Sequence, residues 1–171
     1  ANIDTLIIER SGQRLELGRN GPTWEIRQPF TAGADSITIL KLLDALERSR
    51  VKDRFTTREM ERRSLNLGDL GLSPPITRVV TRSPARRLEL LFGTALLSTN
   101  EIYATSDLAV NSIVVIDREP LDAIPISLDR LRERTLWRES QVRVTAIEWR
   151  RPRMPFVKLI RNGDEWLMVQ P

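Results

Sequence analysis

The sequence contains neither cysteine nor histidine among its 171 residues. Without cysteine there is no disulfide bond and no thiol nucleophile, and without both residue types the usual zinc sites are excluded. A histidine general base is excluded as well. The sequence also has no phosphate-binding loop, dinucleotide fingerprint or nucleophile elbow. We therefore expect a protein that is not an enzyme and that binds no cofactor and no metal.

Long apolar runs are missing too. The longest, residues 88–97, is interrupted by Glu89 and Gly93 and is well short of the roughly 18 residues that a membrane-spanning helix needs. We expect no membrane span within this chain. The apolar share of 40% and the charged share of 29% are ordinary for a globular domain, so a core without disulfide bonds is expected.

Lysine is rare, because 24 of the 27 basic residues are arginine, and the net charge is +4. Acidic residues alternate with the arginines, as at Glu133 between Arg132 and Arg134. A nucleic-acid-binding surface needs basic charge that is gathered on one face. The composition therefore favours a mixed, solvated surface, and a domain that binds nucleic acid or another anionic polymer is the alternative.

A repeat is the most informative positive feature. The segment Arg19–Pro29 returns without a gap as Arg161–Pro171, and six of the eleven residues are identical. The shared Asn-Gly predicts a type I′ hairpin turn, the Trp predicts a core anchor in the next strand, and the Pro ends the ladder of hydrogen bonds. The structural anchors of the repeat are therefore Asn20, Gly21 and Trp24 in the first copy and Asn162, Gly163 and Trp166 in the second.

Periodicity predicts the elements around this repeat. A three-stranded meander is expected over residues 3–28, followed by a helix that Asp35 caps and that carries an aliphatic stripe of Ile39, Leu42, Leu43 and Leu46. Thr57 is expected to cap a short helix. Two pairs of strands then form a second sheet or extend the first, and short helices follow. The expected strands are 76–82 with 87–92, and 102–105 with 112–116, and the expected helical region is 120–137.

The predicted fold class is α+β, with antiparallel β-meanders and helices packed on one face. Residues 1–140 form one full repeat, and residues 141–171 repeat the opening meander. No helix follows this second meander, and a bare meander exposes its apolar face. We expect it to pack on the rest of the chain, on further C-terminal sequence or on another molecule.

Several short motifs occur in a characteristic order along the chain. They are Trp-x-x-x-x-Pro at 24–29, Ala-Asp at 34–35 before the Leu-rich helix, Gly-Leu-x-x-Pro at 71–75, Phe-Gly at 92–93, Tyr-Ala at 103–104 and a Leu-x-x-Arg helix at 128–132. This order resembles a bacterial domain-of-unknown-function family, number 4340.

The resemblance implies a location and a kind of partner. Members of the family usually carry an N-terminal membrane anchor, place repeated domains outside the cytoplasm, and are often associated with transporter systems resembling those of gliding motility. No activity, cofactor or catalytic residue set comes with the family. The anchor would lie in an N-terminal segment that this chain does not contain.

Two arginine clusters and two tryptophans are the candidate partner-binding residues. An exposed tryptophan at a sheet edge would be an interaction anchor, and clustered arginines would bind an anion or an acidic patch. A solvated arginine surface is the competing interpretation. The candidates are Arg78, Arg82, Arg86 and Arg87 near a hairpin, Arg151 and Arg153 beside Arg150, and Trp137 and Trp149.

Asp107, Asp117, Glu119 and Asp122 are the remaining candidates, for a hydrolase or a calcium site. Their spacing matches no calcium loop, and a glycosidase needs two carboxylates about 5 to 9.5 Å apart in a cleft. We interpret the protein as a non-enzymatic interaction or scaffold domain, the extracytoplasmic part of a membrane-anchored, transporter-associated assembly. The alternatives are an anionic-polymer binder and, third, a carboxylate-based hydrolase.

Overall fold

The chain divides into two compact units, Ala1–Glu133 (unit 1) and Arg134–Pro171 (unit 2). The computed structural model describes residues 3–96, 99–108, 112–125, 127–134, 143–150, 152–153 and 156–170, all with side chains except 57 and 170. The division falls after residue 133 rather than after residue 140. Across the described residues the fold is mostly antiparallel β-sheet with a few short helices.

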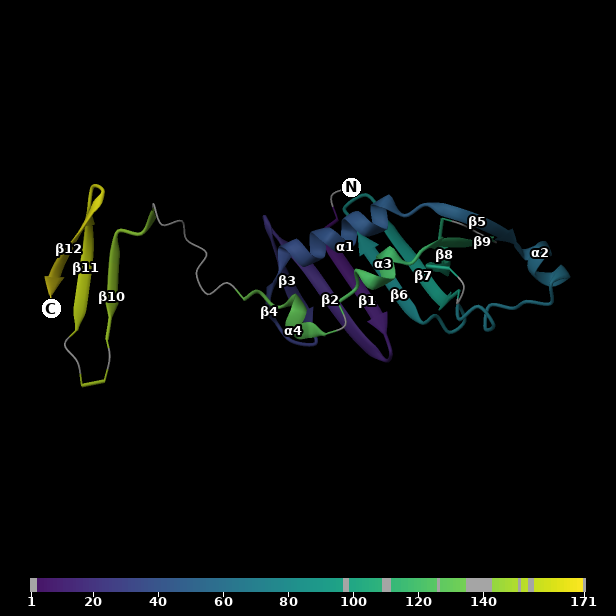
Figure 1. The fold of residues 1–171 in the computed structure, drawn as a ribbon, viewed down its shortest axis with the longest axis horizontal. Helices are drawn as coiled ribbons and strands as arrows, with labels where there is room; N and C mark the ends of the chain where they lie inside the picture. The colour runs from purple at the N-terminus through teal and green to yellow at the C-terminus, as the bar shows by residue number, and fades with distance from the viewer. Residues whose placement is uncertain are drawn as a thin grey trace. The chain divides into compact units, whose positions relative to one another are not determined.

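Unit 1 is built on one nine-stranded antiparallel sheet, in the order β4-β3-β2-β1-β6-β7-β8-β9-β5 (Figure 1). Most of these strands fall where the alternation of apolar residues predicts them. Their bounds are β1 Thr5–Arg10, β2 Gln13–Asn20, β3 Thr23–Gln28, β4 Ala32–Ala34, β5 Val51–Thr56, β6 Thr77–Arg82, β7 Arg87–Ala95, β8 Glu101–Ser106 and β9 Ser112–Asp117.

The sheet is continuous because β6 pairs with β1 along its whole length, from Thr5 opposite Arg82 to Arg10 opposite Thr77. The middle strands therefore extend the first sheet, and the alternative of a separate second sheet is wrong. Strand β1 carries three consecutive buried residues, Leu6, Ile7 and Ile8, which is the pattern of a strand covered on both faces.

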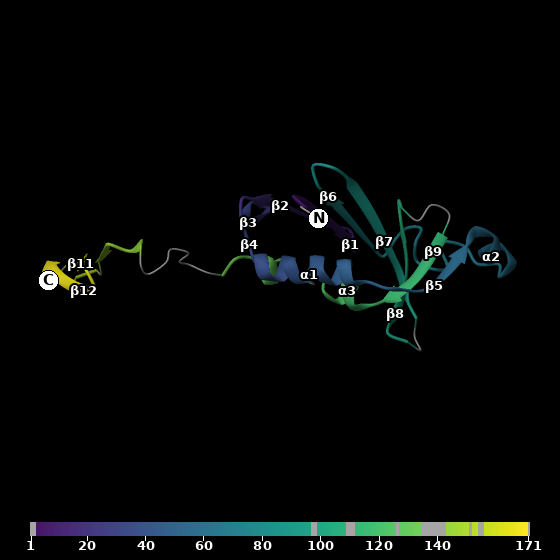
Figure 2. The same cartoon turned by 90° about the horizontal axis from the view of Figure 1, so that it is seen from above.

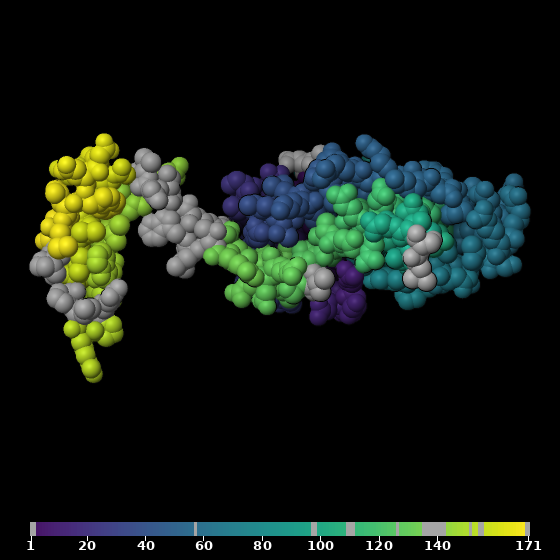
Figure 3. Space-filling view, in the orientation of Figure 1, coloured from purple at the N-terminus to yellow at the C-terminus, as the bar shows by residue number. Residues whose placement is uncertain are grey.

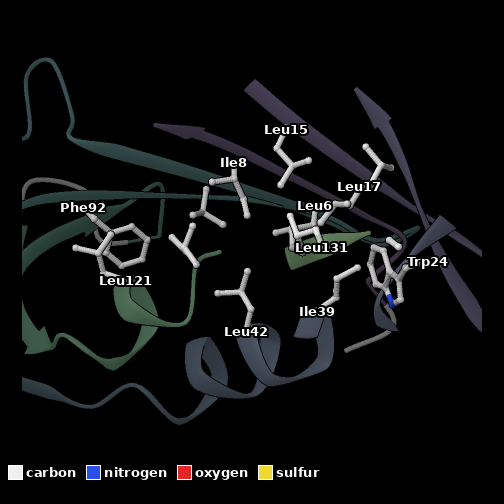
Figure 4. Packing of buried hydrophobic residues seen from close by; sticks show 14 of the residues in the cluster. Leu6, Ile8, Leu15, Leu17, Trp24, Ile39, Leu42, Phe92, Leu121 and Leu131 are labelled. Carbon is white, nitrogen blue, oxygen red and sulfur yellow. The ribbon is translucent and has the colours of Figure 1, made fainter. Parts of the chain in front are cut away.

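Helix α1, Ser36–Arg48, supplies the largest covering surface of the sheet. The Asp35 carboxylate accepts hydrogen bonds from the Ile37 amide at 3.1 Å and from the Thr38 hydroxyl at 2.6 Å, so the predicted cap is confirmed. Ile39 and Leu42 are fully buried and point from α1 toward the sheet (Figure 4).

Two short helices complete this layer. Helices α3, Glu119–Asp122, and α4, Leu128–Leu131, add Leu121 and Leu131 to the cluster that α1 joins. Figure 2 shows α1 and α3 along one side of β1 and β6, and in Figure 3 the α3–α4 segment (green) lies beside α1 (blue). The Asp35 amide donates to the Leu131 carbonyl at 2.7 Å, which ties α4 to the start of α1.

The other face of the sheet is covered at one end by the segment 57–75. Helix α2, Thr57–Arg62, is capped by Thr56 rather than by Thr57, because Thr56 and Glu59 form a reciprocal capping box. Met60, Leu70 and Leu72 then pack with Ile113 of β9 in a second buried cluster. The expected placing of the helices on one face therefore does not extend to α2.

Unit 2 is a three-stranded antiparallel sheet in the order β10-β11-β12. Its strands are Ala146–Trp149 (β10), Val157–Asn162 (β11) and Glu165–Gln170 (β12). The turn between β11 and β12 contains Gly163 with φ of 63°, and the turn between β2 and β3 contains Gly21 with φ of 59°. Both values lie in the left-handed region that type I′ turns require.

Candidate interaction surfaces

The two meanders share their strand register. Arg161 stands opposite Trp166 as Arg19 stands opposite Trp24, and each arginine Nε donates to the carbonyl of the turn glycine, at 2.9 and 3.1 Å. Both ladders also shift register at the equivalent place, between Lys158 and Leu159 in unit 2 and between Glu16 and Leu17 in unit 1.

The same correspondence reaches the first strand of each meander. Ile147 pairs with Leu159 and Trp149 with Val157, as Leu6 pairs with Leu17 and Ile8 with Leu15. Side chains at alternate positions of paired strands lie on one face of a sheet. Unit 2 therefore has one face that carries Arg161 and six apolar residues, and these six are called here the unit 2 apolar face: Ile147, Trp149, Val157, Leu159, Trp166 and Met168.

The six equivalent residues of unit 1 are all buried, with exposed fractions between 0% and 9%. They are Leu6, Ile8, Leu15, Leu17, Trp24 and Ile26. The unit 2 apolar face is not covered in this way: Ile147 is 38% exposed, Trp149 42%, Trp166 39% and Met168 62%, and Val157 and Leu159 are half-buried.

Trp24 and Trp166 therefore differ in environment although they share a register position. Trp24 is 4% exposed in the core of unit 1, where α1 lies against it (Figure 4). The expectation that Trp166 also fills a core is wrong for unit 2, because no described element of that unit lies over the ring. Trp149, expected as an exposed anchor, is exposed and lies on the same face. Trp137 lies outside the described residues.

Five members of this face were absent from the sequence-predicted partner-binding residues, and one of them, Trp166, was predicted as a structural anchor instead. The five are Ile147, Val157, Leu159, Trp166 and Met168. The alternation of apolar residues along 146–168 was the available signal. An apolar patch of this kind on a described surface is typical of a protein-binding site.

The arginine cluster near the β6–β7 hairpin has a different character. Arg78 lies in mid-strand, where its guanidinium donates to Glu9 Oε2 at 2.8 Å and to Glu89 Oε1 at 2.7 Å. Arg87 also pairs with Glu89, and Arg14 bridges Glu9 and Glu16. This network therefore contains three arginines and three glutamates and has no net charge.

The network perturbs the ionisation of its members. The hydrogen bond from Arg78, followed by that from Arg87, lowers the pKa of Glu89 to about 2. The same guanidinium lowers the pKa of Glu9, and the two carboxylates raise the pKa of Arg78. Because Arg78 and Arg87 are neutralised locally, they are poor anion ligands. Arg82 and Arg86 are exposed, and no carboxylate of the described residues lies within ion-pair distance of them.

The second arginine cluster is only partly described. The Arg150 guanidinium stacks over the Phe156 ring, 4.7 Å from its centroid, and Arg153 is exposed in a turn with φ of 66°. Arg151 lies outside the described residues. A cation over an aromatic face is already in a favourable environment, so the Arg150 side chain is held against its own sheet.

The candidate carboxylates do not converge. Asp117 pairs with Lys52 at 3.3 Å, Asp122 with Arg118 at 2.9 Å, and Glu119 lies 4.0 Å from Arg48. Asp107 is exposed at the end of β8. In the described part of the chain, no group of three or more acidic side chains is placed to hold a metal ion.

Three cavities in unit 1 are large enough to hold a small ligand. The largest of the three, about 520 Å³, lies between the β1–β2 hairpin and α4 and is lined by apolar residues together with Arg10, Ser11, Gln13 and Arg14. Another of about 300 Å³ lies beside Leu90 and Phe92, and the third, about 450 Å³, contains Glu9 but no second carboxylate. None of the three is lined by Asp107, Asp117, Glu119 or Asp122.

Comparison with known proteins gives no further guide. No protein-family model matches the chain, and neither the curated proteins nor the solved structures include one that is significantly similar to it. The likeness to family 4340 stays a prediction from the motifs. Among the described residues, no helix has the length and apolar character needed to cross a membrane.

Proposed function

We propose that the protein is a non-enzymatic interaction domain, in which unit 1 is a folded scaffold and unit 2 binds another protein through its apolar face. The observation that carries the proposal is the exposure of four of the six residues of that face, between 38% and 62%. Exposed tryptophan and methionine side chains in one patch are typical of protein-binding surfaces.

The repeat belongs to this proposal. Unit 2 is the opening meander of a second repeat, because its turn, register and register shift correspond to those of β1–β3. In the first copy, the layer of α1, α3 and α4 covers the equivalent face. No described element of unit 2 forms such a layer, and the face is available to a binding partner.

The cellular setting rests on the family resemblance. The domain lies outside the cytoplasm, is anchored to the membrane by a segment outside this chain, and takes part in a transporter-associated assembly. Protease treatment of intact cells tests the location. We expect the protease to digest the protein in intact cells or in cells with a permeabilised outer membrane. Protection until the inner membrane is broken would refute the extracytoplasmic location.

Site-specific photocrosslinking tests the interaction itself. A photoreactive residue at Met168, which is 62% exposed on the unit 2 apolar face, is expected to form a covalent adduct with another protein in the native cells. The matched control is Leu40 on α1, which is 58% exposed on the outer side of unit 1. Equal adduct yields at both positions, or none at Met168, would refute unit 2 as the binding surface.

Binding to nucleic acid or another anionic polymer is the second candidate, favoured by the exposed Arg82, Arg86 and Arg153 and by the pI near 10.3. It predicts micromolar DNA affinity that falls steeply with salt. The neutral Arg78 network argues against nucleic-acid binding, and we expect no binding at low salt.

A carboxylate-based hydrolase is the third candidate. It predicts turnover of a small substrate that is lost when one acidic residue is changed, and such turnover would refute the interaction domain.

A further inference from the structure

We infer that unit 1 binds a small amphipathic carboxylate, a carboxylic acid with one hydrocarbon chain, in the cavity of about 520 Å³ between the β1–β2 hairpin and α4. The apolar walls, the charge and the volume of this cavity support the inference. It goes beyond the proposed function and does not depend on it, because the described residues that line the cavity all belong to unit 1.

The apolar walls of the cavity come from both layers of unit 1. Strands β1 and β2 contribute Ile8 and Leu15, which stand opposite each other, and the helical layer contributes Ile124, Leu128 and Leu131. Figure 4 shows Ile8 and Leu15 on the side of the sheet that faces Leu131. Side chains of this kind offer a ligand no hydrogen bond, so this part of the cavity suits a hydrocarbon chain.

The charge of the cavity is positive. Arg10 and Arg14 line it, and none of the described lining residues is acidic. Arg14 is already engaged by Glu9, Glu16 and Gln28. The half-buried Arg10 differs, because its guanidinium has no hydrogen-bond or ion-pair partner among the described residues. Arg10 is therefore the residue that would bind an anion in this cavity.

Arg10 is placed to bind the charged end of a molecule whose chain lies along the apolar walls. It follows Ile8 by two positions on β1, so the two side chains lie on the same face of the sheet. Gln13 stands opposite Arg10, and Ser11 is in the turn beside it. A guanidinium donates two parallel hydrogen bonds to a carboxylate, and an amide or a hydroxyl group donates a further one. The polar groups thus gather at the hairpin end of an otherwise apolar cavity.

The volume of the cavity limits the length of the chain. About 520 Å³ corresponds to roughly 17 water molecules at about 30 Å³ each. Decanoate, a ten-carbon carboxylate, fits within this volume, whereas much longer chains would extend into solvent. A nucleotide or a sugar phosphate fits less well, because the hydroxyl groups of its sugar would lie unpaired against the apolar walls.

Methyl NMR of the full chain, titrated with decanoate, tests the inference. We expect saturable shifts of the methyl groups of Ile8, Leu15, Ile124, Leu128 and Leu131. A series of chain lengths adds a quantitative test. The affinity should rise about fourfold for each added CH₂ group from hexanoate to decanoate, and it should level off for longer chains that extend beyond the walls.

Matched variants test the role of the charge. Arg10→Gln should weaken decanoate binding at least about tenfold and leave the weaker binding of decanol unchanged, and Arg10→Lys should recover part of the loss. The control is Arg86→Gln, which removes the same charge from an exposed residue outside the cavity and should leave decanoate binding unchanged. Leu128→Trp fills the cavity and should weaken decanoate and decanol alike. Methyl signals elsewhere in unit 1 report whether each variant is folded.

Several outcomes would overturn the inference. They are no shift of the cavity methyl groups, equal affinity for decanoate and decanol, an affinity that keeps rising well beyond ten carbons, and an equal effect of Arg10→Gln and Arg86→Gln. Shifts at Leu90 and Leu108 instead would assign the ligand to the cavity of about 300 Å³, which Arg54 lines.

The proposed function has a separate readout. Shifts confined to Val157, Leu159 and Met168 would mean that decanoate binds only to the unit 2 apolar face, and the cavity would then not be a ligand site. The absence of decanoate binding would end this inference and leave the proposed function standing. The absence of a crosslinked adduct from Met168 would end the proposed function and leave the ligand site standing.

Discussion

Replacing Trp24 and Trp166 by alanine compares one residue at one register position in two environments. Each tryptophan follows an Asn-Gly turn and stands opposite an arginine, Arg19 or Arg161. Trp24 is 4% exposed, and Trp166 is 39% exposed. Comparing the two substitutions therefore separates what the covering layer adds to the free energy of unfolding from what the turn and the strand add.

The magnitudes follow from this difference. A tryptophan buries about 150–250 Å² at about 25 cal/mol per Å², which is roughly 4–6 kcal/mol for nearly complete burial. Alanine keeps part of that burial, and a cavity remains, so Trp24→Ala should cost about 3–5 kcal/mol. Trp166→Ala leaves no enclosed cavity, and much of the remaining cover of Trp166 is local to its own strands. We expect it to cost about 1 kcal/mol.

The assay has to report on each unit separately, because two units need not unfold together. A urea titration followed by hydrogen exchange gives one free energy of unfolding for unit 1 and another for residues 146–170. Trp24→Ala should destabilise unit 1 and leave unit 2 unchanged. A cost of 3 kcal/mol or more for Trp166→Ala would refute the reasoning, since it would mean that the ring is buried in the isolated chain.

Three further predictions concern unit 1. Because the pKa of Glu89 is lowered to about 2 from an ordinary 4.5, its stabilising effect is complete above pH 4.5 and is lost as pH falls toward 2. Glu89→Gln should cost about 1–2 kcal/mol at pH 7 in urea unfolding and reduce the acid sensitivity, whereas the exposed Glu61→Gln should change neither. Gly93→Ala should cost about 1–3 kcal/mol in thermal unfolding, because its Cβ would lie 2.1 Å from the Leu70 carbonyl oxygen. Asp35→Ala should cost about 1 kcal/mol, and Asp35→Ser should recover most of it.

The elements with strong local signals were predicted from the sequence. The Asn-Gly turns, the Asp35 cap, the stripe of α1 and the turn between β6 and β7 all depend on residues within a few positions of one another. Local chemistry decides such features, so a single sequence contains the information. The edges of β7 and β8 differ from the prediction by a few residues, as expected where strands fray.

The edge strands and the long-range pairing were missed. Strand β5 reads Val-Lys-Asp-Arg-Phe-Thr and only Phe55 is partly buried, so its pairing with β9 depends on backbone hydrogen bonds that leave no apolar pattern. Strand β4 has three small residues, Ala-Gly-Ala, with little preference for a strand. The pairing of β1 with β6 joins residues 67 to 77 positions apart, from Arg10 with Thr77 to Thr5 with Arg82, and alternation alone does not specify a neighbour.

The exposure of Trp166 could not be read from the sequence for a related reason. Alternation tells which face of a strand is apolar but not what lies over it, so the same eleven-residue pattern accompanies a buried ring in unit 1 and an exposed ring in unit 2. The environment is decided by elements outside the pattern, which in the first copy are α1, α3 and α4. The candidate site was missed because the pattern does not tell whether such an element covers the strands.

A meander without its covering layer should also depend on a partner for stability. Three strands with one uncovered apolar face are marginal on their own, so the folded fraction of unit 2 should rise when a partner binds only the folded form. At a partner concentration 100 times its Kd, the linked stabilisation is about 2.7 kcal/mol. Unit 1 has its own core, so its free energy of unfolding should not change when the partner binds. Hydrogen exchange that slows in 146–170 alone, by about a hundredfold at that concentration, is the expected signature of such coupling. Equal slowing of hydrogen exchange in both units would mean that the partner also contacts unit 1. The binding surface would then include residues of both units.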